Sequence, residues 1–178
     1  MKIIRRRRKE GLTNYKKRII LLKSRIPRLV IRKSNRSINM QIVEYLEDGD
    51  KVLLHVESNR LAKFGWPARR NTPTAYLTGM LFAKMAKEKK LDKEYILDIG
   101  LHKPAKASIL FAAAKGAVDS GLNLRNSIEF DESRIDGTHI KNYAEKVAGK
   151  KHQFSAFKEA VEITELFNKV KNEINKAE

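Results

Sequence analysis

The chain has 178 residues, contains no cysteine and carries a formal net charge of +17. This length allows one domain with a hydrophobic core plus extensions, and the lack of cysteine excludes disulfides and thiolate metal sites. No uncharged run approaches the roughly 18 to 20 apolar residues that a membrane-spanning helix needs, and the N-terminus lacks the apolar segment of a signal peptide. The sequence therefore predicts a cytosolic protein.

Most of the charge lies in the first 36 residues. They include 15 lysines and arginines and one acidic residue, Glu10, whereas the rest of the chain holds 23 basic and 20 acidic side chains. Such a localised charge favours a polyanion, because each phosphate that is neutralised releases condensed counterions. Asn14, Tyr15 and the run Ile19–Leu22 add packing and stacking groups that a solvated tail lacks. A disordered tail, or a basic amphipathic helix on a membrane surface at residues 5–25, is the alternative.

The segment after Pro27 predicts an antiparallel meander. The β-branched centre of Arg28–Lys33 indicates a short strand, with residues 34–37 as its turn. An alternating pattern begins at Ile38 and continues to a hairpin signal at residues 47–50, and the returning strand is predicted over residues 51–56.

A loop rich in basic residues is predicted after Ser58. We expect its tryptophan, Trp66, to meet a nucleic-acid base or sugar. Thr72 followed by Pro73 indicates an N-cap with proline at the first helical position, and the apolar stripe beyond it predicts a helix that ends near Lys90.

The second half of the chain predicts a strand and helices. Tyr95–Leu101 has the apolar density of a buried strand, residues 105–120 predict a helix with Gly121 as its C-cap, and residues 127–130 predict a weaker strand. A further helical stripe runs from Ser155 to Ile174, packed on the domain or on a partner. Strand-helix-strand units favour parallel crossovers, so the sequence predicts an α/β (α+β) fold with a mixed sheet flanked by helices.

Motifs for catalysis are nearly absent from the sequence. The four histidines have no metal-binding spacing, and no glycine-rich phosphate loop is present. Asp98, on a predicted buried strand, is the one residue that suggests a metal-dependent nuclease, which would need further clustered carboxylates. We expect Asp98 to accept hydrogen bonds or face a cation instead. The sequence predicts no cofactor and no metal site.

Basic residues beyond the extension are predicted to converge on one edge of the sheet. There, planar guanidinium groups can bind phosphates bidentately, and helix N-termini after Asn71 and His102 can add oriented amides. The candidates are Arg28, Arg32, Lys33, Asn35, Arg36, Lys63, Arg69, Arg70, Lys103 and Lys106.

Two runs of residues carry a family resemblance. Residues 11–18 and 27–42, and later Asp98–Leu101 followed by the alanine-rich helix up to Leu122, resemble the eighteenth protein of the large ribosomal subunit, a 5S-rRNA-binding family. The match covers roughly residues 5–145, and the long form is similar to the archaeal type shared with eukaryotes. Residues from about Lys150 onward match nothing in that family.

The resemblance implies a structural ribosomal protein without enzymatic activity. It implies an α/β core on 5S rRNA in the central protuberance of the large subunit, and an extension between that RNA and the large-subunit rRNA. Its implied partners are these two RNAs and neighbouring ribosomal proteins, with no membrane and no small-molecule substrate. The candidate RNA-binding residues are Arg5, Arg6, Arg7, Arg8, Lys9, Asn14, Tyr15, Lys16, Arg18, Lys23, Arg25, Arg28, Arg32, Ser34, Asn35, Arg36, Arg69, Arg70, Lys103 and Lys106.

These inferences divide the chain into three regions. Residues 1–26 are predicted to be a basic RNA-binding extension, residues 27–148 an α/β core that binds rRNA, and residues 149–178 a C-terminal helical extension. A basic architectural nucleic-acid-binding protein outside the ribosome is the alternative function, ahead of a metal-dependent nuclease. Structured RNA is read through shape, phosphates and unstacked bases, which fits a folded reader combined with a basic arm.

Overall fold

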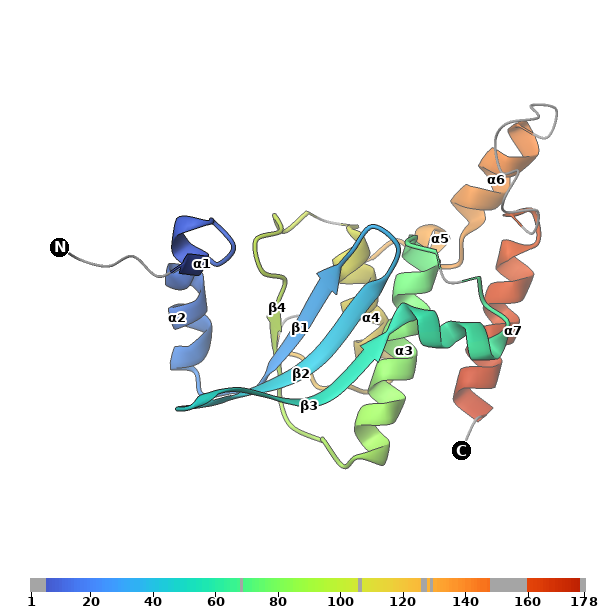
Figure 1. The fold of residues 1–178 in the computed structure, drawn as a ribbon. Helices are drawn as coiled ribbons and strands as arrows, with labels where there is room; N and C mark the ends of the chain where they lie inside the picture. Colours follow the sequence, from blue (N-terminus) through green and yellow to red (C-terminus); the bar gives the residue numbers. More distant parts are fainter. Residues whose placement is uncertain are drawn as a thin grey trace.

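A four-stranded mixed sheet lies at the centre of the computed structural model (Figure 1). The structure describes residues 6–67, 69–105, 107–125, 128, 130–147 and 160–176. The strands are β1 (Arg28–Lys33), β2 (Ile38–Leu46), β3 (Gly49–Glu57) and β4 (Ile96–Asp98), in the order β3-β2-β1-β4. The first three form the predicted antiparallel meander, and β4 pairs with β1 in parallel. The predicted mixed α/β fold is therefore confirmed.

The two faces of the sheet differ in chemistry. Successive side chains of a strand point to opposite faces, so Leu29 and Ile31 enter the core with no exposed area. Between and beside them, Arg28, Val30 and Arg32 line a cavity on the other face. One face is thus the hydrophobic core, and the other carries charged groups.

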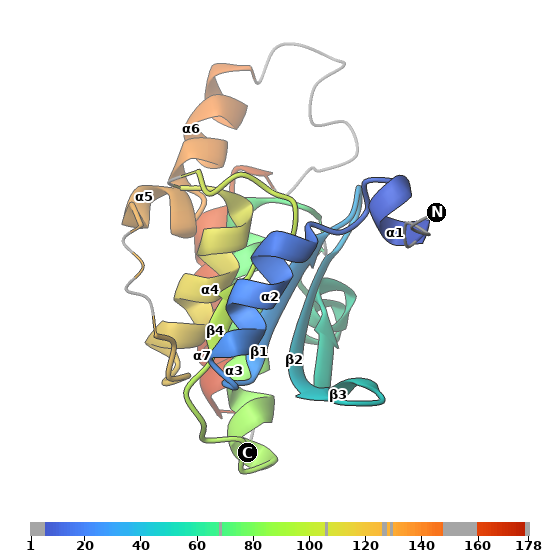
Figure 2. The ribbon, with the colours of Figure 1, turned by 90° about the vertical axis from the view of Figure 1, so that its left-hand side faces the viewer.

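Helices cover both faces of the sheet, but unequally (Figures 1 and 2). On the core face lie α3 (Thr72–Glu88) and α4 (Ile109–Asp119), and α7 (Ile163–Lys176) packs on α3. On the opposite face lie α1 (Arg6–Lys9) and α2 (Tyr15–Lys23). The 3₁₀ helix η1 (Ser58–Phe64) follows β3, and α5 (Glu132–Ile135) and α6 (Thr138–Lys146) precede α7. Among the described segments, no helix is both long and apolar enough to cross a membrane.

Two glycines let α3 and α4 pack backbone against backbone. A Cβ atom added at Gly79 would collide with the carbonyl oxygen of Ala113, and one added at Gly116 would collide with the carbonyl oxygen of Tyr76. Because each collision is with backbone, no rotamer change relieves it. The helix pair behind the sheet therefore requires glycine at both positions.

We expect Gly79→Ala to lower the free energy of unfolding by about 1–3 kcal/mol, the usual cost of overpacking. Helix propensity alone predicts the opposite, a gain of roughly 0.5–1 kcal/mol. Urea denaturation measures the difference, with Lys87→Ala at an exposed position of the same helix as the control. A stabilised Gly79→Ala protein would contradict this helix packing.

Helix boundaries differ from the predictions by a few residues. Asn71, rather than Thr72, caps α3 by accepting a hydrogen bond from the Thr74 N–H at 2.8 Å. The second helix, α4, begins at Ile109 rather than near residue 105, after Ser108 in extended geometry. At the end of α4, Ser120 is the cap residue, and Gly121 follows it with a φ of 93°. This left-handed conformation favours glycine, since other residues adopt it with strain.

The prediction that Trp66 meets nucleic acid is wrong. Its side chain is 1% exposed, and its indole Nε1–H donates to the Thr74 hydroxyl at 2.8 Å. Phe167 of α7 packs edge-on against it with ring centroids 6.3 Å apart. The neighbouring cations suggested an exposed aromatic, but burying a large ring against α7 is more favourable.

Two predicted elements lie partly outside the described residues. Of the weak strand at 127–130, Ser127 and Glu129 lie outside them, and Ile128 and Phe130 are not in a strand. Leu124 instead forms a single parallel bridge with Tyr95. Residues 155–159 of the C-terminal stripe also lie outside the described residues, and the helix that the structure shows begins at Ile163.

Candidate nucleic-acid interface

The second half of the basic extension is a short helix on the charged face of the sheet. The Asn14 side chain begins α2 by accepting a hydrogen bond from the Lys17 N–H at 3.1 Å, as a typical N-cap does. Lys17 Nζ then donates to the Gly100 carbonyl at 3.1 Å, and Arg18 pairs with Asp50 of β3 at 2.9 Å. Side chains of α2 thus connect it to both edges of the sheet.

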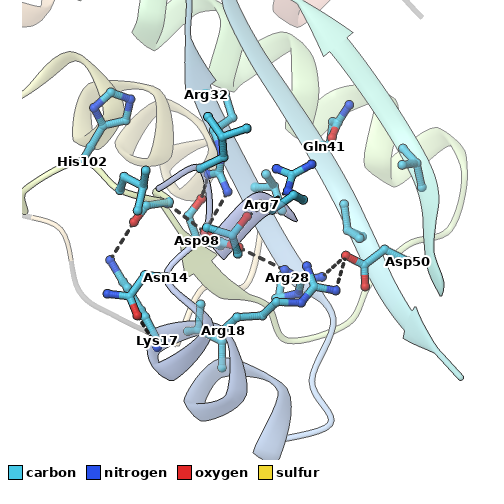
Figure 3. A pocket seen from close by; sticks show the side chains of 18 residues that line it. Arg7, Asn14, Lys17, Arg18, Arg28, Arg32, Gln41, Asp50, Asp98 and His102 are labelled. Carbon is cyan, nitrogen blue, oxygen red and sulfur yellow. Dashed lines mark hydrogen bonds and ion pairs between the residues drawn. The ribbon is translucent and has the colours of Figure 1, made fainter. Parts of the chain in front are cut away.

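A chain of ion pairs continues beneath α2 (Figure 3). Buried Arg28 donates from Nη2 to Asp50 at 2.8 Å and from Nη1 to Asp98 at 3.0 Å. Arg32 donates from Nη2 to the Asp98 carboxylate at 3.0 Å. The side chains of Arg28 and Asp98 are only 4% and 9% exposed. We call Arg18, Arg28, Arg32, Asp50 and Asp98 the ion-pair cluster.

The Asp98 carboxylate is held in its charged form. Burial alone raises the pKa of an aspartate, but the charge of Arg32, the Gly100 N–H and the charge of Arg28 together outweigh this effect. The resulting pKa of Asp98 lies below its ordinary value. The expectation that Asp98 accepts hydrogen bonds and faces a cation is confirmed. Within the described part of the chain, no three histidine or acidic side chains are grouped so that they could hold a metal ion.

Gly100 makes the close approach of Arg32 possible. Its N–H donates to Asp98 Oδ1 at 2.8 Å, and its φ is +65°. A Cβ atom at this position would lie 2.9 Å from Cζ of the Arg32 guanidinium. Both the backbone conformation and the space therefore favour glycine here.

A cavity of about 460 Å³ lies between the extension and the charged face of the sheet. Figure 3 shows the ion-pair cluster, Lys17, Gln41 and His102 around it. Burial and the nearby charges of Lys33 and Arg32 lower the pKa of His102. The histidine is therefore neutral at pH 7, and the charge of the cavity comes from its arginines, Lys17 and the two aspartates.

A second group of basic residues surrounds the end of β1. Ser34 N donates to Ser37 O at 2.8 Å, which closes the turn and leaves Asn35 and Arg36 exposed. Arg70 reaches this turn, with Nη1 3.4 Å from the Ser34 carbonyl. A groove of about 660 Å³ begins beside the turn, and its polar lining residues are Lys33, Asn71, Thr72, His102, Lys103, Ser108, Arg134 and His139. We call this groove, with the turn and Arg70, the basic edge.

The structure places the sequence-predicted site residues in three environments. Exposed are Arg6, Arg7, Arg8, Lys9, Asn14, Lys16, Lys23, Arg25, Ser34, Asn35, Arg36, Arg69, Arg70 and Lys103. Half-buried are Tyr15, Arg18 and Arg32, and Arg28 is buried in ion pairs. Arg5 and Lys106 lie outside the described residues. Of the basic residues predicted to converge at a sheet edge, Arg70 reaches the turn after β1, and Lys33 and Lys103 line the same groove.

Several residues of the interface were not selected from the sequence. Lys17 could have been found, because Asn14 before a run of helix-forming residues is an N-cap signal for α2. Asp50 lies at the start of β3, directly after the hairpin turn, and nothing in the local sequence indicates a partner 32 residues away. Arg134 of α5 and His139 of α6 join the basic edge because the fold brings them to the groove that Ser108 lines just before α4.

The chain is similar in sequence to known ribosomal proteins. A family model described as ribosomal large subunit proteins 60S L5 and 50S L18 matches residues 1–96. Large ribosomal subunit protein uL18 of Korarchaeum cryptofilum (strain OPF8) is 48% identical over 145 residues, which cover 80% of this chain and 74% of the relative. The protein of the same name from Ignicoccus hospitalis is 48% identical over 150 residues, which cover 82% and 72%.

The family resemblance that the sequence suggested is therefore confirmed, in its archaeal form. These relatives are structural components of the large ribosomal subunit and not enzymes. Because the family model matches more than half of the chain and both relatives are 48% identical over most of it, the chain belongs to the ribosomal protein family of 60S L5 and 50S L18.

Proposed function

We propose that this structural protein of the large ribosomal subunit binds 5S rRNA and helps attach it to the large-subunit rRNA in the central protuberance. The observation that carries the proposal is the position of α2. Its ion pair with Asp50 and its hydrogen bond to Gly100 place the basic extension on the sheet. The extension and the basic edge are therefore two cationic surfaces of the same folded domain.

The two surfaces have different parts in the proposal. The exposed arginines of α1 have no fixed partners among the described residues apart from short local contacts of Arg6 and Arg7, so they supply electrostatic affinity for any phosphate backbone. The basic edge has a shape set by the Ser34 turn and Arg70, and it supplies preference for one RNA fold. Arg28 does not bind phosphate in this proposal, because both of its Nη groups already donate to carboxylates.

We propose that the core binds rRNA and that the residues after 148 support it. Phe167 of α7 packs on Trp66 and Tyr76, so the C-terminal helix stabilises the loop that carries Arg69 and Arg70. Cationic surface alone would also fit an architectural nucleic-acid-binding protein. The family membership favours the ribosomal role.

A filter-binding titration at near-physiological salt tests the proposal, with 5S rRNA compared with tRNA and duplex DNA of equal charge. We expect a preference for 5S rRNA of about a hundredfold, or roughly 2.7 kcal/mol. Arg36→Gln combined with Arg70→Gln should reduce this preference about tenfold, because both arginines belong to the basic edge. The charge-matched control replaces Arg60 and Arg125, which lie elsewhere on the surface. Equal binding of the three nucleic acids by the unmodified protein would refute 5S rRNA as the specific partner.

A further inference from the structure

The cavity beneath α2 has the dimensions of a small-ligand site. Its volume of about 460 Å³ falls within the roughly 300–1,000 Å³ of such sites. Its lining comes from the α1–α2 region, from all four strands and from the loop after β4. Segments far apart in the sequence thus enclose one space, which Figure 3 shows from close by.

The floor of this cavity suits a flat, largely apolar group. Val30, Val43 and Val52 contribute apolar side chains from three adjacent strands, and Leu21 of α2 lies among the lining residues. Gln41 lies in the same lining, and its side chain forms no hydrogen bond with the other described residues. An amide of this kind can both donate to and accept from the edge of a nucleobase.

The rim of the cavity suits a phosphate. Five cationic side chains, Arg7, Lys17, Arg18, Arg28 and Arg32, line it, against two carboxylates. Arg28 is only 3% exposed and both of its Nη groups are paired with carboxylates, so it adds positive charge to the cavity without contacting the ligand. Arg7, Lys17, Arg18 and Arg32 are exposed or half-buried, so a phosphate that enters the cavity can reach them.

We infer that this cavity receives one unpaired nucleotide of the bound RNA. The base lies on the valine floor with its edge toward Gln41, and the phosphate lies against Arg7, Lys17, Arg18 and Arg32. Guanidinium planes stack on unpaired bases, and such splayed nucleotides are the parts of RNA that proteins read most specifically. The inference rests on the proposed function, because the extension and the basic edge hold the RNA around the cavity.

Mononucleotides test the cavity independently of 5S rRNA. The full chain, with labelled valine methyl groups, is titrated in separate NMR experiments with AMP, CMP, GMP, UMP and inorganic phosphate. We expect at least one nucleotide to shift the methyl signals of Val30, Val43 and Val52 saturably at millimolar concentration. Inorganic phosphate at the same concentration should leave them in place. No response to any nucleotide, or an equal response to phosphate alone, would overturn the inference.

Filling the cavity tests the same idea within the RNA complex. Val30→Phe should weaken 5S rRNA binding about tenfold and restore the 2′-hydroxyl reactivity of a single unpaired nucleotide that the unmodified protein protects. The rest of the protected region should be unchanged. Val52→Phe, at a half-exposed position of the same lining, is the second variant in case Val30→Phe fails to fold. Val161→Phe, at an exposed position outside the cavity, is the matched control.

The two experiments separate two kinds of failure. Filled variants that keep both the affinity and the complete footprint would overturn the nucleotide site while leaving 5S rRNA binding intact. If the unmodified protein shows no preference for 5S rRNA, the proposed function fails, and the mononucleotide titration still decides whether the cavity takes a base.

Discussion

Replacing the four basic residues of α1, Arg6–Lys9, with glutamine is expected to weaken RNA binding by up to about a thousandfold at roughly 0.1 M salt. Each lost phosphate contact reduces the slope of log K against log salt by about 0.7–0.9. Four lost contacts therefore flatten it by about three. The physical reason is the loss of counterion release, which does not depend on sequence, so 5S rRNA, tRNA and duplex DNA should be affected alike.

The measurement is a salt titration of binding for each nucleic acid. The matched control replaces Lys87, Lys89, Lys90 and Lys93 with glutamine, four exposed cations near the C-terminal end of α3. The control removes the same charge from a surface outside the interface. If both variants flatten the slope equally, the extension has no special part in binding, and only the net charge matters.

Asp98→Asn is expected to lower the free energy of unfolding by about 3–5 kcal/mol at pH 7, the cost of removing one partner from a buried ion pair. Its carboxylate pairs with Arg28 at 3.0 Å and with Arg32 at 3.0 Å, and Arg28 has almost no contact with solvent. The substitution leaves the Arg28 charge buried with Asp50 as its remaining acidic partner. A urea titration at pH 7 gives the difference.

The pH dependence of this effect has a definite sign. The pKa of Asp98 is lower in the folded protein than its ordinary value, so its stabilising contribution is present above about pH 4 and is lost as the pH falls through the folded value. The difference between the unmodified protein and Asp98→Asn should therefore shrink in acid. Asp92→Asn, at an exposed position, should change stability by less than about 0.5 kcal/mol. A gap between the unmodified protein and Asp98→Asn that stays constant down to pH 2 would contradict the ion-pair account.

Local patterns were sufficient to predict the meander and the two helices of the core. The strand Arg28–Lys33 has the predicted bounds, and β2 and β3 turn at the predicted hairpin signal. The parallel pairing of β4 with β1 agrees with the expected crossover. These features depend on alternation, turn residues and helix periodicity, which are properties of neighbouring residues.

Which side chains of the candidate interface are buried could not be predicted from local sequence patterns, because it depends on contacts between distant residues. The sequence marked Arg28 as a candidate for RNA and Trp66 as an exposed aromatic, and the fold buries both side chains. Their burial follows from partners distant in the chain, Asp98 at a separation of 70 residues and Phe167 of α7. The sequence around a basic residue of a strand is the same whether that side of the sheet is exposed to solvent or covered by a helix, so burial of the side chain cannot be predicted from it.

By itself, the sequence of this protein determined the family, the mixed sheet and the basic extension, because charge, periodicity and family motifs are carried by the residues themselves. Only the tertiary structure decided which cations are free and which are paired, since that depends on where α2 lies and on which strand lies beside β1. Folding brings Asp50, Asp98 and the extension together on one face of the sheet. The cavity beneath α2 exists only as a result of that arrangement.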